Sequence, residues 1–296
     1  MFYTTSMDKD HPKLPRYGRI PDPPPMRLTG RDQHILEAIH AYDGLIGFSQ
    51  IQRMYFSCKS QAERRMMLLY QHKYVNRPNF DERKRLPEMV YWLDKRGAEI
   101  IASLEGSSLA EFTWRKEPRW FQVEHDLAVN DFRLDLLEAC HSNPDVTLET
   151  WVPESEFWSY PDKVVYTYQD NKMKRNIRPD GFFILTTGEH RIRYLLEIDR
   201  STEDNPRFLR EKILPGLAYI RSQAYEDRFG HRSGRWLVVT TGERRLRNML
   251  QQAHRGDAKG LFYFTTFDKI TNKSILLSPI WRRVDREEHI PLLFLD

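Results

Sequence analysis

Apolar residues recur at helical spacing near the start of the chain, each time after residues that favour a helix start. Residues 27–44 predict a first helix with Thr29 as its N-cap, Asp32 near its positive end and Gly44 as its stop. The next predicted elements are a helix over 48–56 capped by Ser49, a helix over 59–75 capped by Ser60, a strand, polar turn and strand over 74–94, and a short helix over 95–105. Three short helices with a hairpin are typical of a winged helix-turn-helix.

The third predicted helix and the hairpin carry an excess of positive charge. From Arg53 to Arg85 there are nine Lys or Arg residues and three Asp or Glu residues. In a winged helix-turn-helix the third helix enters the major groove of DNA, where Arg and Gln can read base edges. The side chains expected to contact DNA are Lys59, Gln61, Arg64, Arg65 and Lys73 on the helix and at its end, and Arg83, Lys84 and Arg85 at the wing tip. The alternative is a solvated basic face on a protein-binding module, which predicts no salt-dependent retention of DNA.

Changes of composition mark the borders of this region. Residues 1–26 are rich in Pro and charge, and "PDPPP" favours an extended polyproline II arm, either free or packed on the body. The loop formers Gly106, Ser107 and Ser108 predict a linker. The domains expected are an arm over 1–26, a winged helix-turn-helix over 27–105, a linker over 106–118 and a second domain over 119–296.

The second domain alternates between apolar runs and amphipathic stretches. The predicted order is a long helix over 119–140, a strand over 146–154, a strand, turn and basic stretch over 163–179, strands over 181–187 and 191–199, a helix over 205–229 that Pro215 kinks or breaks, a strand over 234–242, a helix over 243–254 and a strand over 260–270. This order favours a mixed sheet between helices. The expected fold class is therefore α/β in the broad sense, with a mixed sheet as in α+β proteins.

Three acids stand at the ends of two apolar runs in this domain. Asp180 precedes the run 181–187, and Glu197 and Asp199 end the run 191–199. If the two runs pair as a hairpin, the first acid lies opposite the other two, which share one face at i and i+2. Converging carboxylates suit Mg²⁺ or Mn²⁺, which can activate water and offset phosphoryl charge. Taken singly, each acid also fits an ordinary turn residue or salt-bridge partner.

These residues carry a resemblance to known families. "RPD" over 178–180 and "EID" over 197–199 resemble the two halves of the PD-(D/E)xK nuclease motif. The motifs "LTGRDQHIL", "EHDLAVNDF", "IRPDGFF", "LLEIDRSTE" and "KILPGLAY", in this order over roughly residues 27–270, resemble the replication-relaxation family. The resemblance implies a winged helix-turn-helix followed by a restriction-endonuclease-like domain, in a protein of plasmids or other mobile elements.

The resemblance also implies roles for single residues and two alternative functions. Glu124, on the first helix of the second domain, would add a catalytic acid. Asp199 replaces the lysine that usually ends the motif, and Lys212 or Arg200 would supply the missing cation. One function is a metal-dependent DNA endonuclease or nickase in replication or mobilisation. The other is a non-catalytic replication factor or transcriptional regulator with a degenerate nuclease fold.

Composition argues against several other classes. Two Cys residues among 296 disfavour a disulfide framework or a Cys-based zinc site and suit a reducing cytoplasm. No stretch approaches the roughly 18 apolar residues of a membrane span. No HxH pattern accompanies the tyrosines, which disfavours tyrosine-based nicking. The expected partner is double-stranded DNA, and homodimerisation stays open because helix-turn-helix proteins often dimerise.

Overall fold

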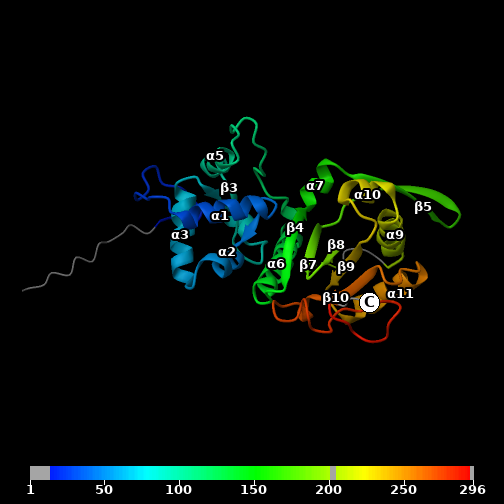
Figure 1. Ribbon diagram of the computed structural model, residues 1–296. Coiled ribbons are helices and arrows are strands. Elements are labelled where there is room, and N and C mark those ends of the chain that lie inside the picture. The colour runs from blue at the N-terminus through cyan, green and yellow to red at the C-terminus, as the bar shows by residue number, and fades with distance from the viewer. Residues whose placement is uncertain (1–13, 201–204, 294–296) are drawn as a thin grey trace, which may run out of the picture. The chain divides into compact units, whose positions relative to one another are not determined.

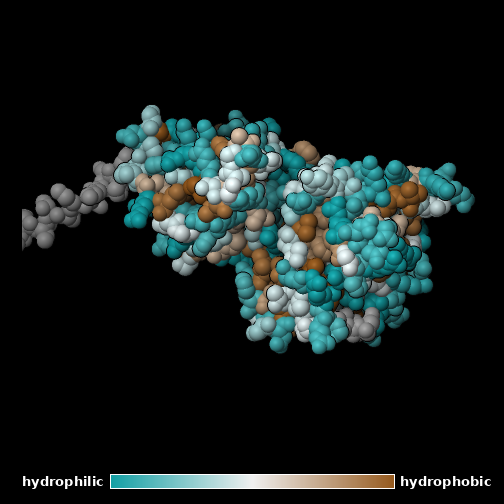
Figure 2. All heavy atoms as spheres, turned by 45° about the horizontal axis from the view of Figure 1, so that its top comes forward, coloured by the Kyte–Doolittle hydropathy of each residue, from teal (hydrophilic) through white to brown (hydrophobic). Residues whose placement is uncertain are grey.

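Helices and a small sheet build the first of the two units into which the chain divides, and a larger sheet builds the second (Figure 1). The computed structural model describes residues 14–200 and 205–293. The first unit runs to Val123 and the second begins at Glu124. Hydrophilic residues cover most of the face shown in Figure 2, with smaller hydrophobic patches between them, in keeping with 30% charged residues. Across the described ranges, no helix has both the length and the apolar character needed to cross a membrane.

The first unit holds its helices around a three-stranded antiparallel sheet. Its helices are α1 (Gly30–Ala41), α2 (Phe48–Tyr55), α3 (Lys59–Gln71), α4 (Phe80–Arg83), α5 (Lys95–Leu104) and the 3-10 turn η1 (Trp120–Gln122). Its strands are β1 (Ile46–Gly47), β2 (Val75–Asn76) and β3 (Val90–Leu93), with β3 in the middle. Ile35 and Ile39 on α1, and Met66 and Leu69 on α3, are fully buried at helical spacing, as the apolar pattern predicts.

The starts of the first three helices test the predicted N-caps. Thr29 caps α1 as predicted. The other two predicted caps are wrong, because α2 follows Gly47 and α3 follows Cys58. Ser49 and Ser60 therefore lie inside the first turns of their helices. A serine caps a helix only when it stands at the boundary itself, and both boundaries fall earlier in the chain.

The connection between β2 and β3 is not the simple polar turn that the sequence analysis expects. It contains α4, and the Asn79 side chain caps this helix by accepting hydrogen bonds from the N–H groups of Asp81 (3.0 Å) and Glu82 (2.9 Å). The Glu82 carboxylate in turn accepts a hydrogen bond from the Asn79 N–H at 2.8 Å. This reciprocal capping box stabilises a helical turn where the expected hairpin would have its tip.

Two segments without regular structure pack on the first unit. In the predicted arm, Arg19 forms an ion pair of 2.6 Å with Asp94. Residues 1–13 of that arm lie outside the described residues. In the predicted linker, the Lys116 carbonyl accepts a hydrogen bond of 3.0 Å from the indole of Trp92. Both segments are therefore tied to the first unit by specific side-chain contacts.

The second unit is a mixed five-stranded sheet between two layers, which confirms the expected α+β fold class. Its helical elements are α6 (Val123–His141), α7 (Glu154–Ser159), α8 (Asn205–Phe208), the π-helical turn η2 (Leu209–Ile213), α9 (Leu214–Ile220), α10 (Gln223–Phe229), α11 (Glu243–Arg255) and the 3-10 turn η3 (Phe267–Lys269). Its strands are β4 (Val146–Pro153), β5 (Asp162–Tyr168), β6 (Asn171–Ile177), β7 (Gly181–Thr187), β8 (His190–Asp199), β9 (Arg235–Thr240) and β10 (Phe262–Thr266). The sheet order is β10-β9-β8-β7-β4, and β5 and β6 form a separate hairpin.

Strand direction changes within the five-stranded sheet. β7 is antiparallel to both of its neighbours, β4 and β8, whereas β8, β9 and β10 are parallel to one another. One face packs against α9, α11 and the β5–β6 hairpin, through residues such as Leu217, Met249 and Tyr166. The other face packs against α6 and the chain after η3, through residues such as Leu136 and Trp281. Both faces are thus covered, as parallel strands require.

Pro215 disturbs its helix as predicted. The five residues of η2 form a π-helical turn directly before α9, and Pro215 stands in the first turn of α9. A proline ring collides with the carbonyl four residues earlier in a regular α-helix, and a wider turn relieves that collision. The consequence for the site is that Lys212 lies on a widened turn.

Candidate functional site

The ends of β7 and β8 place Asp180 beside Glu197. Gly181 pairs with Leu196, and the Asp180 N–H donates a hydrogen bond of 2.9 Å to the Leu196 carbonyl. Residues directly opposite each other in an antiparallel pair project to the same side, so Asp180 and Glu197 share a face of the sheet. Asp199 shares that face because it stands two residues after Glu197. The predicted hairpin and its register are confirmed.

The three acids are buried at the edge of this face. Asp180, Glu197 and Asp199 are 6%, 8% and 8% exposed. Taking a carboxylate out of water costs several kcal/mol unless cations or hydrogen-bond donors compensate for it. The partners of each acid therefore show what this cluster can do.

Asp180 lies against His125. Its Oδ2 is 3.2 Å from His125 Nε2 and accepts a hydrogen bond of 2.6 Å from the Ile198 N–H. Burial by itself would raise the pKa of Asp180, but His125, Lys212 and the Ile198 N–H together lower it. Burial would likewise lower the pKa of His125, but Asp180 and Asp126 raise it to about 11. The neighbouring carboxylates thus favour the charged form of His125.

Glu197 lies against Lys212. The Lys212 ammonium is 2.5 Å from Glu197 Oε1, and the Lys212 side chain is 25% exposed. The positive charge of Lys212 also contributes to the lowered pKa of Asp180. The structure thus brings two acids and one lysine together from positions 180, 197 and 212 of the chain.

Asp199 is engaged by a different cation. Its two carboxylate oxygens accept hydrogen bonds of 3.0 Å each from Arg245, and Oδ2 also accepts one of 2.6 Å from the Thr240 hydroxyl. Among the described residues, no three His, Cys, Asp or Glu side chains gather closely enough to hold a metal ion. The three carboxylates therefore do not converge on one point as expected, because Asp199 forms its ion pair with Arg245 on α11.

Glu124 is paired outside this cluster. It stands in the first turn of α6, and its carboxylate and carbonyl both accept hydrogen bonds from Arg200. Glu124 and Arg200, which the resemblance offers as an extra acid and a replacement cation, are thus joined to each other. Sequence reasoning missed Arg245, and a histidine beside an apolar helix face, as His125 is, is more typical of a hydrogen-bonded packing residue. Their places in "EHD" and "GERRLR" give no signal of which acid they meet.

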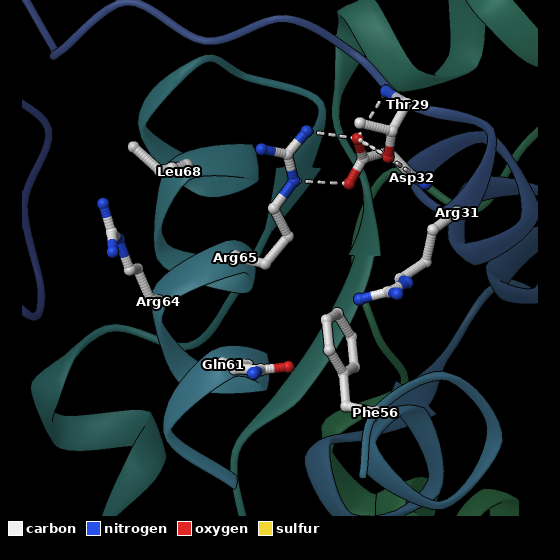
Figure 3. A pocket seen from close by; sticks show the side chains of 8 residues that line it. All are labelled: Thr29, Arg31, Asp32, Phe56, Gln61, Arg64, Arg65 and Leu68. Atoms are coloured by element: carbon white, nitrogen blue, oxygen red, sulfur yellow. Dashed lines mark hydrogen bonds and ion pairs between the residues drawn. The ribbon is translucent and has the colours of Figure 1, made fainter. Parts of the chain in front are cut away.

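The first unit has an open hollow beside α3. This hollow of about 490 Å³ is lined by Thr29, Arg31, Asp32, Phe56, Gln61, Arg64, Arg65 and Leu68 (Figure 3). The residues come from the start of α1, the end of α2 and one face of α3. In Figure 3 the Arg65 side chain points across the hollow to Asp32, whereas Arg64 points away from that pair.

Arg65 holds α3 to α1. Its Nε donates a hydrogen bond of 2.6 Å to Asp32, which is fully buried, and its Nη2 donates to Asp32 and to the Arg27 carbonyl. Burial would raise the pKa of Asp32, but hydrogen bonds from Arg65 and Thr29 lower it. The guanidinium of Arg65 therefore serves an internal ion pair.

The remaining predicted DNA contacts lie mostly on the surface. The exposed ones are Lys59, Gln61, Arg64, Lys73, Lys84 and Arg85. Arg83 is partly buried and donates a hydrogen bond of 2.7 Å to the Leu86 carbonyl. Lys84 pairs with Asp81 at 3.3 Å. In the connection that carries α4, Arg83 and Lys84 therefore both have partners within that connection.

Comparison with known proteins finds one family. A family model described as Replication-relaxation matches residues 37–232 of the 296. No curated protein and no solved structure matches the chain. The matched range contains α3, the paired ends of β7 and β8, and Lys212.

Proposed function

Because the chain belongs to the replication-relaxation family, we propose that it binds double-stranded DNA and cleaves a phosphodiester bond with the help of a divalent metal. The observation that carries the proposal is the placement of Asp180 beside Glu197, with Lys212 at 2.5 Å from Glu197. Together, these two acids and this lysine resemble the residue set of the PD-(D/E)xK nuclease motif. In this chain Asp199 occupies the position where the motif usually has its lysine, and the lysine, Lys212, lies on η2 instead.

The donor set suits Mg²⁺ or Mn²⁺. Asp180 and Glu197 offer hard carboxylate oxygens, and Mg²⁺ commonly binds through one or two carboxylates while it keeps several waters. Within the chain, His125 and Lys212 offset the negative charge of the two acids. A bound metal ion would add positive charge in place of that from His125 and Lys212. When bound, the metal would supply an activated water and positive charge for the phosphoryl oxygens.

The chain's own residues would have separate tasks. Lys212, beside Glu197, would hold the attacking water and offset charge on the phosphate. His125 would fix the orientation of Asp180 through its 3.2 Å contact. Arg245 and Asp199 would fix the end of β8, so that Glu197 keeps its position two residues earlier.

DNA recognition would belong to the first unit. Lys59, Gln61 and Arg64 are exposed on α3. α3 is the third helix of the unit, and in a winged helix-turn-helix the third helix enters the major groove. Arg65 would hold α3 in position through its ion pair with Asp32.

DNA binding by the first unit is tested with a labelled duplex of random sequence. Lys59→Gln/Arg64→Gln should lose affinity, whereas Lys95→Gln on α5 should not. Equal affinity of all three proteins would remove α3 from the interface.

Cleavage is tested with supercoiled plasmid incubated with the purified protein and Mg²⁺ or Mn²⁺. The wild type should nick or linearise the plasmid, and EDTA or Asp180→Asn should abolish this. Glu149→Gln is the matched control, because Glu149 pairs with Arg191 at the other end of the same hairpin. No cleavage by the wild type, or equal cleavage by Asp180→Asn, would overturn the nuclease proposal.

One observation favours a second candidate, a DNA-binding replication factor that does not cleave. Asp180, Glu197 and Asp199 each have a cation partner within the chain, which is also how a purely structural cluster is neutralised. This candidate predicts salt-sensitive DNA binding with no cleavage under any metal. In the plasmid experiment, it corresponds to intact supercoiled DNA together with retained binding.

A further inference from the structure

A second hollow, in the second unit, is lined by arginines. It measures about 640 Å³ and lies between α11 and residues 282–287. Within the part of the chain that the structure describes, five arginines and one acid, Glu287, line it. The arginines are Arg247, Arg255, Arg282, Arg283 and Arg286. We call this hollow the arginine groove.

Two well-anchored elements form the walls of the arginine groove. α11 buries Leu246 and Met249 against the sheet, which leaves Arg247 on the outer side of the helix. Gln251 and His254 follow Arg247 at i+4 and i+7 and lie on the same face. The opposite wall is fixed by two backbone hydrogen bonds, of 2.9 and 2.8 Å, between Arg282 and Phe264 at the edge of β10.

The charge of the arginine groove is only partly compensated within the chain. Arg283 is tied to Asp285 by a hydrogen bond of 2.9 Å. Arg247 and Arg255 are exposed, and neither forms an ion pair with any residue in the described ranges. Like charges held on fixed walls repel one another, and an anion between them would remove that repulsion. The groove is therefore built to favour an anionic partner.

We propose that the arginine groove binds the sugar–phosphate backbone of DNA, an inference that rests on the DNA partner of the proposed function. Guanidinium groups bind phosphate oxygens in bidentate fashion, and several arginines along one groove match the repeated charge of a nucleic-acid strand. Leu250 and Val284 add apolar side chains to the lining, against which sugars can pack.

The helix α11 connects the arginine groove to the acid cluster. α11 carries Arg245, which binds Asp199 at the end of β8, and Arg247 stands two residues further along the same helix. Opposite sides of one helix thus serve the cluster and the arginine groove. A backbone held by the groove would extend along α11, and it would add affinity without sequence preference.

The test compares salt dependence of binding in full-length proteins. Affinity for a labelled random duplex is measured by fluorescence anisotropy at several salt concentrations for the wild type and Arg247→Gln/Arg255→Gln. The matched control is Lys163→Gln/Lys273→Gln, which removes the same charge from exposed positions outside the groove. Each lost phosphate contact lowers the slope of log K against log salt by about 0.9, so the groove variant should lose up to about 2. The control should keep the wild-type slope.

The outcomes separate this proposal from the proposed function. If the wild type binds no DNA, both fail. If the wild type binds and the groove variant keeps the same slope, or loses no more than the control, the arginine groove alone is refuted. Competition by polyglutamate as strong as that by DNA, at equal charge, would assign the groove to an acidic polypeptide and overturn the proposal. Thermal unfolding of each variant confirms that it is folded.

Discussion

Removing Lys212 tests the electrostatics of the acid cluster directly. Lys212→Met keeps the length of the side chain and removes its charge. The Glu197 side chain is 10% exposed and its Oε1 lies 2.5 Å from the ammonium, so the change leaves a buried carboxylate without that compensation. Breaking a buried pair from one side costs roughly 3–5 kcal/mol. Because Lys212 is 25% exposed and water can enter, we expect a loss of about 2–3 kcal/mol.

The assay is urea denaturation in EDTA and again in millimolar Mg²⁺. In EDTA the variant should lose this stability, whereas Lys163→Met, at an exposed lysine of β5, should change by less than about 0.5 kcal/mol. If Asp180 and Glu197 hold a metal, Mg²⁺ should stabilise Lys212→Met more than the wild type, because the ion replaces the missing charge. A loss below about 1 kcal/mol in EDTA would refute the reasoning about burial. Equal effects of Mg²⁺ on both proteins would refute the reasoning about the metal.

Three further predictions concern stability. Asp32→Asn removes the partner of Arg65 from a buried ion pair and should cost about 3 kcal/mol in urea denaturation; a change within about 0.5 kcal/mol would contradict a structural role. Gly97→Ala would place a Cβ 2.1 Å from the Tyr74 carbonyl oxygen, so it should lower the melting temperature, and the gain usual for Ala in a helix would argue against this packing. Burial would raise the pKa of Glu211, but hydrogen bonds and charges from three arginines lower it to about 2 from 4.5. Its contribution is therefore present above pH 4.5 and lost as the pH falls toward 2, and Glu211→Gln should remove that part of the pH dependence of unfolding.

The sequence predicts much of the fold because local patterns determine its elements. The apolar runs around Thr187 and Gly188 pair as predicted, with Gly188 at a φ of +54° in the turn. The register then follows, since both flanking strands must bury their apolar sides. Pro215 marks the disturbed helix for an equally local reason, the loss of its N–H.

The partners of the acids could not be predicted in the same way. Arg245 meets Asp199 across 46 positions, and His125 meets Asp180 across the fold, so only the assembled sheet and helices decide these pairs. Lys212 was a candidate because the motif resembles one that needs a lysine, although nothing local distinguishes it from neighbouring cations. The same limit applies to Arg65, which the pattern assigns to DNA and the structure joins to a buried acid.

Calorimetric titration of Mg²⁺ into the full-length protein measures directly whether Asp180 and Glu197 hold a metal ion. We expect Mg²⁺ to bind the wild type and Glu149→Gln, and not to bind Asp180→Asn or Glu197→Gln. A wild type that binds no Mg²⁺, or the same binding curve for the wild type and Asp180→Asn, would rule out a metal site at these two acids.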